Sequence, residues 1–224
     1  MVRELRSGVW WLDLGGVNAY LVDDDGTLTL VDAGFPWHGD DVVDGVVEAG
    51  YTLADLDRVL VTHYDLNHVG GLDRLSGLDV PVYAGRADAP LVAGDRSPRP
   101  TSFKSATQRA MGLLAPSHCL EVRPVVDGDS VGSFTVYETP GHTDGHVAYV
   151  SETLETALLG DLVRESGGDL AASPWFISED ADRVRRSVRD LADRAPPFEV
   201  AAVGHGVPFE RRGKERLDEL AATL

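Results

Sequence analysis

Residues 62–71, Thr-His-Tyr-Asp-Leu-Asn-His-Val-Gly-Gly, constrain the fold of this chain more than any other segment. They follow the apolar run 59–61, which predicts a buried strand, and the paired glycines then allow a sharp turn toward a helix. Two histidines, a carboxylate and a carboxamide share this turn: His63, His68, Asp65 and Asn67. Side chains in a tight turn at the end of a strand can converge on one point, and imidazole and oxygen ligands suit a metal ion. The first hypothesis is therefore a metal site.

Three further polar residues also follow predicted strands. His142 lies in a Pro-Gly-His-Thr segment, Asp161 follows a Leu-Leu-Gly run, and His205 lies between two glycines. Each is a weak signal alone, because a histidine or a Gly-Asp pair after a strand is more often a turn residue than a ligand. Together with residues 62–71, they predict strand ends that meet at one place.

The remaining histidines have weaker settings. His38 and His118 lack such neighbours, so we expect surface or packing roles for them. His146 could orient a ligand or serve as an ordinary hydrogen-bonding residue, and the sequence leaves both roles open.

The composition is that of a globular protein. The chain has 224 residues, of which 43% are hydrophobic, and no linker interrupts it, so we expect one domain spanning residues 1–224. No apolar stretch approaches the length of a membrane span, and the first six residues lack the apolar core of a signal peptide. The single cysteine, Cys119, excludes an internal disulfide framework and fits a reducing compartment. These features predict a cytoplasmic protein without membrane partners.

The charge is strongly negative. Asp and Glu number 37 against 20 basic residues, which gives −17, and only Lys104 and Lys214 are lysines. An excess of Asp with scarce Lys resembles halophilic proteins, in which salt screens the self-repulsion; an ordinary acidic protein is the alternative. The chain has no basic stripe that could follow phosphates, so nucleic-acid binding is disfavoured.

Apolar patterning predicts strands in both halves of the chain, each half with helices. The expected strands are 9–12, 19–22, 27–31, 59–61, 80–83, 122–126, 134–137, 147–150, 157–159 and 200–203. The expected helices are 40–49, 72–75, 106–114, 180–192 and 215–222. This distribution favours two packed sheets with helices outside.

Taken in order, five motifs resemble the metallo-β-lactamase superfamily over nearly the whole chain. They are Asp32-Ala33-Gly34, the histidine loop ending in Gly-Gly, the Pro-Gly-His-Thr segment, the Gly-Asp at 160–161 and the late Gly-His at 204–205. The resemblance implies an α+β fold, an αββα sandwich of two mixed β-sheets flanked by helices. It also implies a metal site at one edge between the sheets.

The resemblance implies roles for individual residues. His63, Asp65 and His142 would bind the first metal, and Asn67, His68 and His205 would bind the second. Asp161 would bridge both metals, and Asp32 would steady the loop. One or two divalent ions are implied, zinc first, with iron or manganese as alternatives.

Two loop positions depart from the family pattern His-x-His-x-Asp-His. Asp65 replaces the second histidine, and Asn67 replaces the aspartate. The number of carboxylates stays the same, but one negative charge moves from the second metal to the first. We therefore expect the first metal to bind more strongly than the second. Asn67 can accept a hydrogen bond from a water but cannot act as a base.

The implied function is a metal-dependent hydrolase of small esters, lactones or thioesters that uses a metal-activated water. Asp65, Asn67 and Asp161 are the expected catalytic residues. One alternative is an iron dioxygenase-like protein with a single iron held by His63, His142 and Asp161; another is an impaired metal-binding domain, which Asn67 would explain. The expected partner is a small-molecule substrate, and a homodimer is one assembly that the sequence leaves open.

Specificity is expected to come from segments around the site. Residues 84–117 form an irregular insertion where related enzymes place substrate-covering elements. Arg164 could meet an anionic substrate group or form a surface salt bridge. Trp37, Trp175 and Phe176 could line a pocket, although core packing is the default expectation for aromatic residues.

Overall fold

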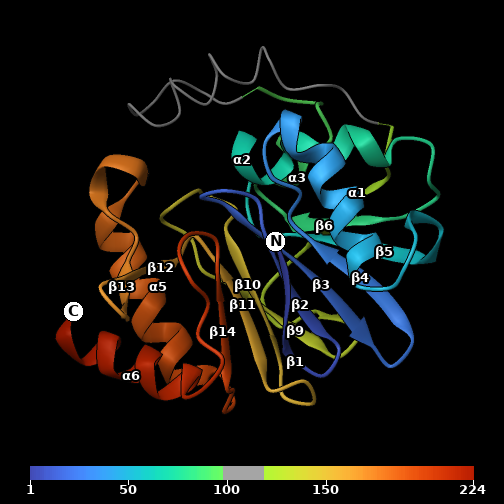
Figure 1. Cartoon of the computed structure of the whole chain (residues 1–224). Helices are drawn as coiled ribbons and strands as arrows, with labels where there is room; N and C mark the ends of the chain where they lie inside the picture. Colours follow the sequence, from blue (N-terminus) through green and yellow to red (C-terminus); the bar gives the residue numbers. More distant parts are fainter. Residues whose placement is uncertain (98–118) are drawn as a thin grey trace.

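Two β-sheets pack face to face, with helices on both outer faces, in the computed structural model of the chain, which describes residues 1–97 and 119–224 (Figure 1). The larger sheet has seven strands in the order β1-β2-β3-β4-β5-β6-β7, and the smaller has five in the order β14-β11-β10-β9-β8. A two-stranded ribbon, β12-β13, lies beside the second sheet. The expected sandwich of two mixed sheets flanked by helices is confirmed.

Both sheets are mixed because each contains parallel and antiparallel pairs. In the first sheet β1 to β4 are antiparallel, whereas β4, β5, β6 and β7 are parallel. In the second sheet β11 and β14 are parallel and the other pairs antiparallel. The strands of the first sheet are β1 (Val2–Arg6), β2 (Val9–Asp13), β3 (Asn18–Asp24), β4 (Thr27–Val31), β5 (Leu56–Val61), β6 (Val82–Gly85) and β7 (Val122–Val125). The others are β8 (Ser130–Val131), β9 (Phe134–Glu138), β10 (Val147–Ser151), β11 (Thr156–Gly160), β12 (Val163–Ser166), β13 (Asp169–Ala172) and β14 (Val200–Val203).

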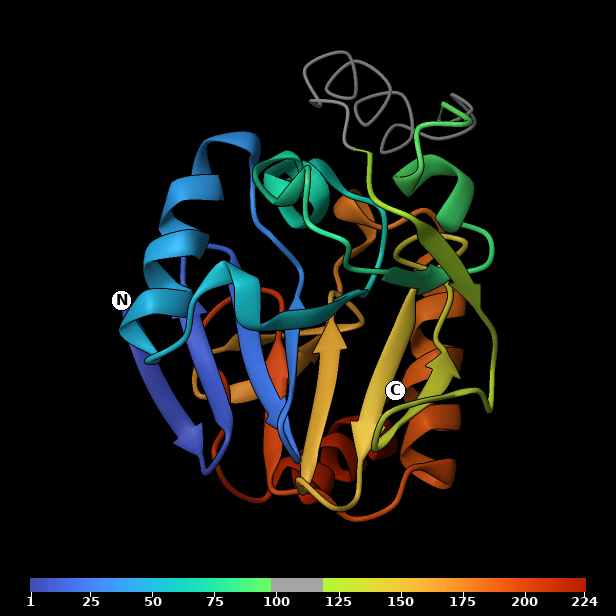
Figure 2. The same ribbon diagram turned by 90° about the vertical axis from the view of Figure 1, so that its right-hand side faces the viewer.

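Amphipathic helices cover the two outer faces. The α-helices are α1 (Gly39–Glu48), α2 (Leu66–Val69), α3 (Ala89–Val92), α5 (Ala181–Arg194) and α6 (Gly213–Thr223), and the 3-10 helices are η1 (Pro36–His38), η2 (Leu53–Asp55), η3 (Gly70–Leu75) and η4 (Trp175–Ile177). Val42 and Val46 of α1 are buried against the first sheet, whereas Val184 and Val188 of α5 are buried against the second. Figures 1 and 2 show α1 on one side of the sandwich and α5 with α6 on the other. The apolar spacing of each helix thus decides which of its faces is buried.

A third apolar cluster fills the space between the sheets. Tyr20 and Leu60 enter it from the first sheet, and Phe134 and Tyr149 enter it from the second. The hydroxyl of Tyr149 lies 3.1 Å from the carbonyl oxygen of Val61, the last residue of β5. This contact ties the second sheet to the strand that leads into the histidine loop.

The structure corrects several details of the secondary-structure prediction. β6 begins at Val82 rather than at residue 80, since Pro81 has no N–H for the ladder. The expected helix at 72–75 is the 3-10 helix η3, which follows the single turn α2. The short or polar elements β1, β8, β12, β13 and α3 were not predicted. The expected helix at 106–114 lies outside the described residues.

No helix among residues 1–97 and 119–224 combines the length and apolarity needed to cross a lipid bilayer.

Asn18 joins the two sheets close to the late Gly-His motif. Its side chain is buried, accepts a hydrogen bond from the indole N–H of Trp11 at 2.8 Å, and donates to the carbonyl oxygens of Val203 at 2.8 Å and Gly206 at 2.7 Å. The hydroxyl of Tyr20 donates to the same Val203 oxygen at 2.6 Å. These bonds hold the end of β14, and the loop after it, against β3.

We expect Asn18→Ala to lower the free energy of unfolding by about 3 kcal/mol, because it leaves a buried indole N–H and buried carbonyls without their partners. Urea denaturation at fixed salt measures the effect. Tyr20→Phe is the matched control, since it removes one hydroxyl bond and should cost about 1 kcal/mol. A loss in Asn18→Ala no larger than that of the control would contradict this role for Asn18.

Candidate metal centre

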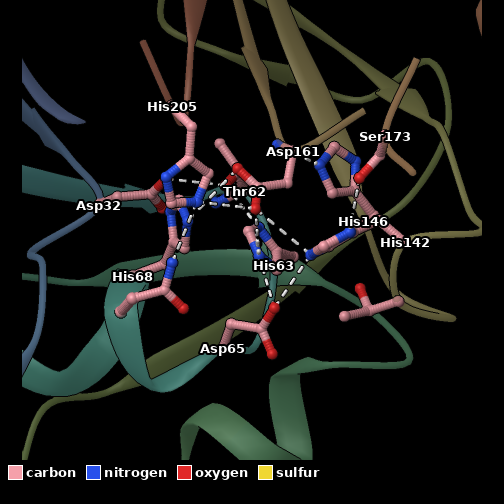
Figure 3. A network of polar contacts seen from close by, with 12 residues as sticks. Asp32, Thr62, His63, Asp65, His68, His142, His146, Asp161, Ser173 and His205 are labelled. Atoms are coloured by element: carbon pink, nitrogen blue, oxygen red, sulfur yellow. Dashed lines mark hydrogen bonds and ion pairs between the residues drawn. The ribbon is translucent and has the colours of Figure 1, made fainter. Parts of the chain in front are cut away.

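The polar residues singled out in the sequence lie at one end of the sandwich, where several strands end. Residues 62–68 follow β5, His142 follows β9, Asp161 follows β11 and His205 follows β14. β4 and β5 are parallel, as are β11 and β14, so the carboxyl ends of each pair lie at the same edge. Figure 3 shows the side chains from these ends directed toward one another.

The first group consists of His63, Asp65, His142 and Asp161, all buried, with ligand atoms within 4.8 Å of one another. Asp65 Oδ2 lies 2.9 Å from His142 Nε2 and 3.2 Å from His63 Nε2. Asp161 Oδ2 lies 3.4 Å from His142 Nε2 and 3.9 Å from His63 Nε2. The carboxylate that replaces the family's second histidine therefore faces this group.

The second group consists of His68, Asp161 and His205. His68 Nε2 lies 3.4 Å from Asp161 Oδ1, and His205 Nε2 lies 3.1 Å from Asp161 Oδ2. Asn67 lies beside this group, with its Nδ2 atom 3.3 Å from His205 Nε2. Asp161 is thus shared by the two groups, and the structure brings together all seven residues named from the sequence.

Two buried polar atoms in the second group, His68 Nε2 and Asp161 Oδ1, form an ion pair with each other at 3.4 Å and have no closer hydrogen-bond partner among the described residues. This contact is longer than an ordinary hydrogen bond, so a species that bonds to both atoms is favoured here. Both are lone-pair donors when the histidine is neutral. The residues present therefore fit a divalent cation.

All four histidines present Nε2 to the groups because a neighbour holds Nδ1. The Nδ1 contacts are His63 with Thr62 Oγ1 at 3.0 Å, His68 with Asp32 Oδ2 at 2.8 Å, His142 with Ser173 Oγ at 3.1 Å and His205 with the Gly16 carbonyl at 2.6 Å. Such contacts fix the ring orientation and the tautomer of metal-binding histidines. The arrangement is that of a prepared ligand set.

Electrostatics separates the two groups. Burial, reinforced by His68 and His142, lowers the pKa of His63 to about 4, so this ring is a neutral ligand at pH 7. Burial alone would also lower the pKa of His68, but the carboxylates of Asp161 and Asp32 outweigh it and raise the pKa to about 10. Burial opposes ionisation of Asp161, yet His68 and His205 hold its pKa well below the usual range. In the metal-free protein a proton on His68 thus balances the Asp161 carboxylate.

Asp32 holds the histidine loop in place at the cost of backbone strain. Its φ of 56° lies in the left-handed region, which is unfavourable for a residue other than glycine. Its carboxylate accepts hydrogen bonds from the Thr62 amide at 2.9 Å and the Thr62 hydroxyl at 2.8 Å, and it also contacts His68 Nδ1. These bonds agree with the steadying role that the family resemblance implies.

Glycines allow the close approaches that the site requires. A Cβ atom on Gly204 would lie 2.0 Å from Asp161 Oδ1, and one on Gly71 would lie 2.2 Å from the Ala33 carbonyl oxygen. Both substitutions would displace neighbouring atoms. The glycines of the Gly-His and Gly-Gly motifs are therefore steric requirements of the site.

The structure resolves the role of His146. Its Nε2 accepts a hydrogen bond from the Asp161 amide at 3.1 Å, its Nδ1 lies 2.8 Å from Thr139 Oγ1, and its ring stacks on His63 at 5.1 Å. His146 therefore holds the backbone of the shared carboxylate. His38 is buried and accepts from the Phe35 amide, apart from both groups, whereas His118 lies outside the described residues.

The default expectation of core packing is wrong for three aromatic residues. Trp37, Trp175 and Phe176 are 67%, 76% and 54% exposed. They lie in η1 and η4, on the connections that follow Asp32 and Ser173. Arg164 forms no ion pair with another described residue, and its Nε is buried without a hydrogen bond there.

We expect zinc binding to the second group at pH 7 to release about one proton from His68, with a further fraction from His205, whose pKa the Asp161 carboxylate raises against burial. Because the pKa of His68 is raised in the folded state, its proton stabilises the metal-free protein. This stabilisation is complete at a pH below the ordinary histidine pKa, and it is lost as the pH rises through about 10. Metal affinity should therefore increase with pH across the neutral range. Calorimetry with zinc in excess, in buffers of different ionisation enthalpy, counts the protons released as the second group fills; release of none in that step at pH 7 would contradict the assignment.

Residues 12–205 match the family described as the metallo-beta-lactamase superfamily. YflN of Bacillus subtilis, described as a probable metallo-hydrolase, is 26% identical over 99% of this chain and 92% of its own. A hydroxyacylglutathione hydrolase of Bdellovibrio bacteriovorus is 29% identical over 49% of this chain and 35% of its own.

Solved structures agree with this family. The metallo-beta-lactamase family protein TTHA1429 from Thermus thermophilus has a TM-score of 0.70 and 25% identity over 98% of this chain and 80% of that one. TTHA1623, solved in a di-iron-bound form, has a TM-score of 0.69 and 28% identity over 92% of each chain. The family and the buried His/Asp cluster together indicate divalent-metal binding. With the family match covering most of its length and the same two-sheet architecture, this chain belongs to the metallo-β-lactamase superfamily.

Proposed function

We propose that this protein is a metal-dependent hydrolase of small esters, lactones or thioesters. The observation that carries the proposal is the buried Asp161 carboxylate shared by two histidine groups, with ligand atoms of both groups directed at it. The relative described as a metallo-hydrolase supports the reaction class. The relative named as a hydrolase of an acylglutathione, which is a thioester, supports the substrate class.

The two groups should bind metal with unequal strength. The first group offers His63, His142 and two carboxylates, whereas the second offers His68, His205 and a share of Asp161. Asn67, beside His205, can add only a neutral amide oxygen after rotation of its carboxamide. Anionic oxygen attracts a divalent cation more strongly than amide oxygen does. The first group is therefore the tight site and the second the weak one.

A divalent ion bound here supplies Lewis acidity toward a carbonyl and lowers the pKa of a bound water. Asn67 can orient a water as a hydrogen-bond partner but cannot take its proton. Asp161 is a poor proton acceptor, because neighbouring histidines hold its pKa well below the usual range. We assign proton acceptance to Asp65, whose side chain is 13% exposed against 5% for Asp161.

Exposed aromatic residues beside the site suit a small substrate with an apolar portion. Trp37 stacks on Phe35 at 4.5 Å on the connection after Asp32, and Trp175 with Phe176 follows Ser173, which contacts His142. Arg164, three residues after Asp161 and without an ion pair among the described residues, suits an anionic group on the substrate. Residues 84–117 were expected to shape specificity, and most of that segment lies outside the described residues.

A single-iron dioxygenase-like activity is the second candidate. The first group contains two histidines and two carboxylates, a ligand set that suits iron as well as zinc or manganese. The relative TTHA1623 has been solved with two irons bound. Iron content, colour and oxygen consumption after aerobic purification separate this candidate from zinc-dependent hydrolysis. A protein that binds metal and shows neither activity would instead be an impaired metal-binding domain.

We expect protein purified without added metal to hold about one tightly bound divalent ion per chain, because only the first group has two carboxylates. Asn67→Asp should raise this value toward two, since it returns an anionic ligand to the second group. Elemental analysis after dialysis against a weak chelator measures both values. Asn67→Ala serves as the control and should stay near one; two tightly bound ions in the unmodified protein would contradict the proposed inequality.

We expect a zinc-loaded sample to hydrolyse at least one ester, lactone or thioester, and chelation to abolish the activity. Asn67→Asp should raise kcat by at least about tenfold, because a positioned carboxylate base contributes roughly 10²–10⁴-fold. Assays with a generic substrate of each class, at saturating zinc, measure the change. Asp65 would then act beside a second carboxylate base; if the unmodified protein equals or exceeds Asn67→Asp, a carboxylate at this position adds nothing to catalysis and the prediction is contradicted.

A further inference from the structure

Asp88 is a buried carboxylate outside both metal groups, on the connection between β6 and α3. Its exposure is 2%, and three hydrogen bonds reach its side chain from two separate loops. The Tyr64 amide donates to Oδ2 at 2.8 Å, the Thr143 hydroxyl donates to Oδ2 at 2.7 Å, and the Gly145 amide donates to Oδ1 at 3.1 Å. One carboxylate thus joins the histidine loop to the Pro-Gly-His-Thr segment.

Helix capping does not account for this side chain. Asp88 occupies the N-cap position of α3, where an aspartate commonly accepts a hydrogen bond from the first turn, but its side chain makes no such bond. Burial raises its pKa to about 6 although Thr143 and two backbone amides favour the charged form. The chain therefore retains a costly buried carboxylate that serves the two loops and not its own helix.

The packing around Asp88 is tight at the second loop. A Cβ atom on Gly145 would lie 2.3 Å from the Asp88 amide nitrogen and 2.6 Å from its Oδ1. Glycine at this position lets the backbone of residues 142–146 approach the carboxylate directly. The contact is a specific fit between the two segments.

Two of the three donors lie next to ligands of the first group. Tyr64 lies between His63 and Asp65, and Thr143 follows His142. The second-group residues His68 and His205 are instead oriented by Asp32 and Gly16. A change at Asp88 would therefore disturb one group far more than the other.

We propose that Asp88 is a positioning residue that holds the His63–Asp65 and His142 loops together and thereby sets the metal affinity of the first group. The inference rests on the proposed metal centre but is independent of which bond the enzyme hydrolyses. Residues that fix the orientation of ligands commonly change metal affinity by about 10–100-fold when replaced. In Asp88→Asn the side-chain NH₂ group would replace one carboxylate oxygen and face a hydrogen-bond donor. At least one of the two loops would then lose the oxygen that accepts its hydrogen bond.

The test measures Co²⁺ and Zn²⁺ affinity by chelator competition, together with the visible spectrum of bound Co²⁺. Asp88→Asn is made in two backgrounds: His205→Ala, which leaves the first group intact, and the double variant His63→Ala/His142→Ala, which removes both first-group histidines and leaves His68, Asp161 and His205. We expect a loss of about 10–100-fold and an altered Co²⁺ spectrum in the first background, with a change below about threefold in the second.

Asp24→Asn is the matched control. Asp24 is a partly buried carboxylate that accepts from Arg58 at 2.7 Å and the Ser133 amide at 2.8 Å, at the opposite end of β3 from the metal groups. Its replacement should lower stability without changing metal affinity in either background. Equal loss of affinity in Asp24→Asn and Asp88→Asn would show a general effect of destabilisation and would overturn the proposal.

Thr143 supplies a second test that does not depend on whether Asp88→Asn folds. Thr143→Val keeps the side-chain volume but removes the hydroxyl donor, and Thr143→Ser restores it. We expect Thr143→Val to weaken first-group affinity by about tenfold and Thr143→Ser to stay near the unmodified protein. Equal metal affinities of Thr143→Val and Thr143→Ser would overturn the role of Asp88 but not the metal centre. So would an Asp88→Asn variant whose first group binds metal as tightly as that of the unmodified protein. Failure of the unmodified protein to bind either metal would overturn the metal centre with it.

Discussion

Asp161 carries a carboxylate that is almost fully removed from water, and its charge has to be balanced by groups from both halves of the chain. A buried anion of this kind is tolerated only when it is paired and hydrogen-bonded. Nε2 atoms of His68, His142 and His205 lie 3.1–3.4 Å from its oxygens, and His146 accepts its backbone N–H. These partners come from different strand ends, so the site forms only when both sheets are in place. Packing of the sandwich and assembly of the ligand set are therefore one event.

Other buried carboxylates extend this arrangement beyond the ligands. Asp32 binds Thr62 and His68, and Asp88 binds Tyr64 and the segment after His142. Each accepts several hydrogen bonds from loops that would otherwise be held only at their ends. The cost of burying these charges is offset by the hydrogen bonds that they accept. The same side chains thus hold the loops that carry the ligands.

The exchange of charge within residues 63–68 gives the two halves of the site different chemistry. Asp65 brings a carboxylate to the first group, where His63 is neutral because of its burial. Because position 67 is an asparagine, Asp161 is the carboxylate of the second group among the described residues. In that group His68 keeps its proton when no metal is bound. A family member with this pattern is expected to rely on one strong site, with proton transfer moved from the position of Asn67 to that of Asp65.

Much of the fold and of the ligand set could be predicted from local patterns. Apolar runs before each turn predicted most strands, and the histidine loop with its four partner motifs predicted the superfamily, because the chemistry of the site requires particular residue types at strand ends. The missed elements β1, β12 and β13 carry polar residues and are stabilised by pairing with neighbours, which leaves little local signal. The sequence could not predict that Trp37, Trp175 and Phe176 are exposed either, because exposure depends on which residues lie nearby in space.

The sequence by itself therefore determined which residue types can bind metal, their order and the unequal distribution of charge between Asp65 and Asn67. The family resemblance already implied a shared Asp161, and the tertiary structure places it between the two groups. Only the tertiary structure decided that His146 holds the backbone of Asp161, and that Asp88 joins two loops whose donors lie 24 to 57 residues from it in the chain. The physical reason is that these roles depend on hydrogen bonds between segments far apart in sequence. Their partners come together only when the two sheets pack.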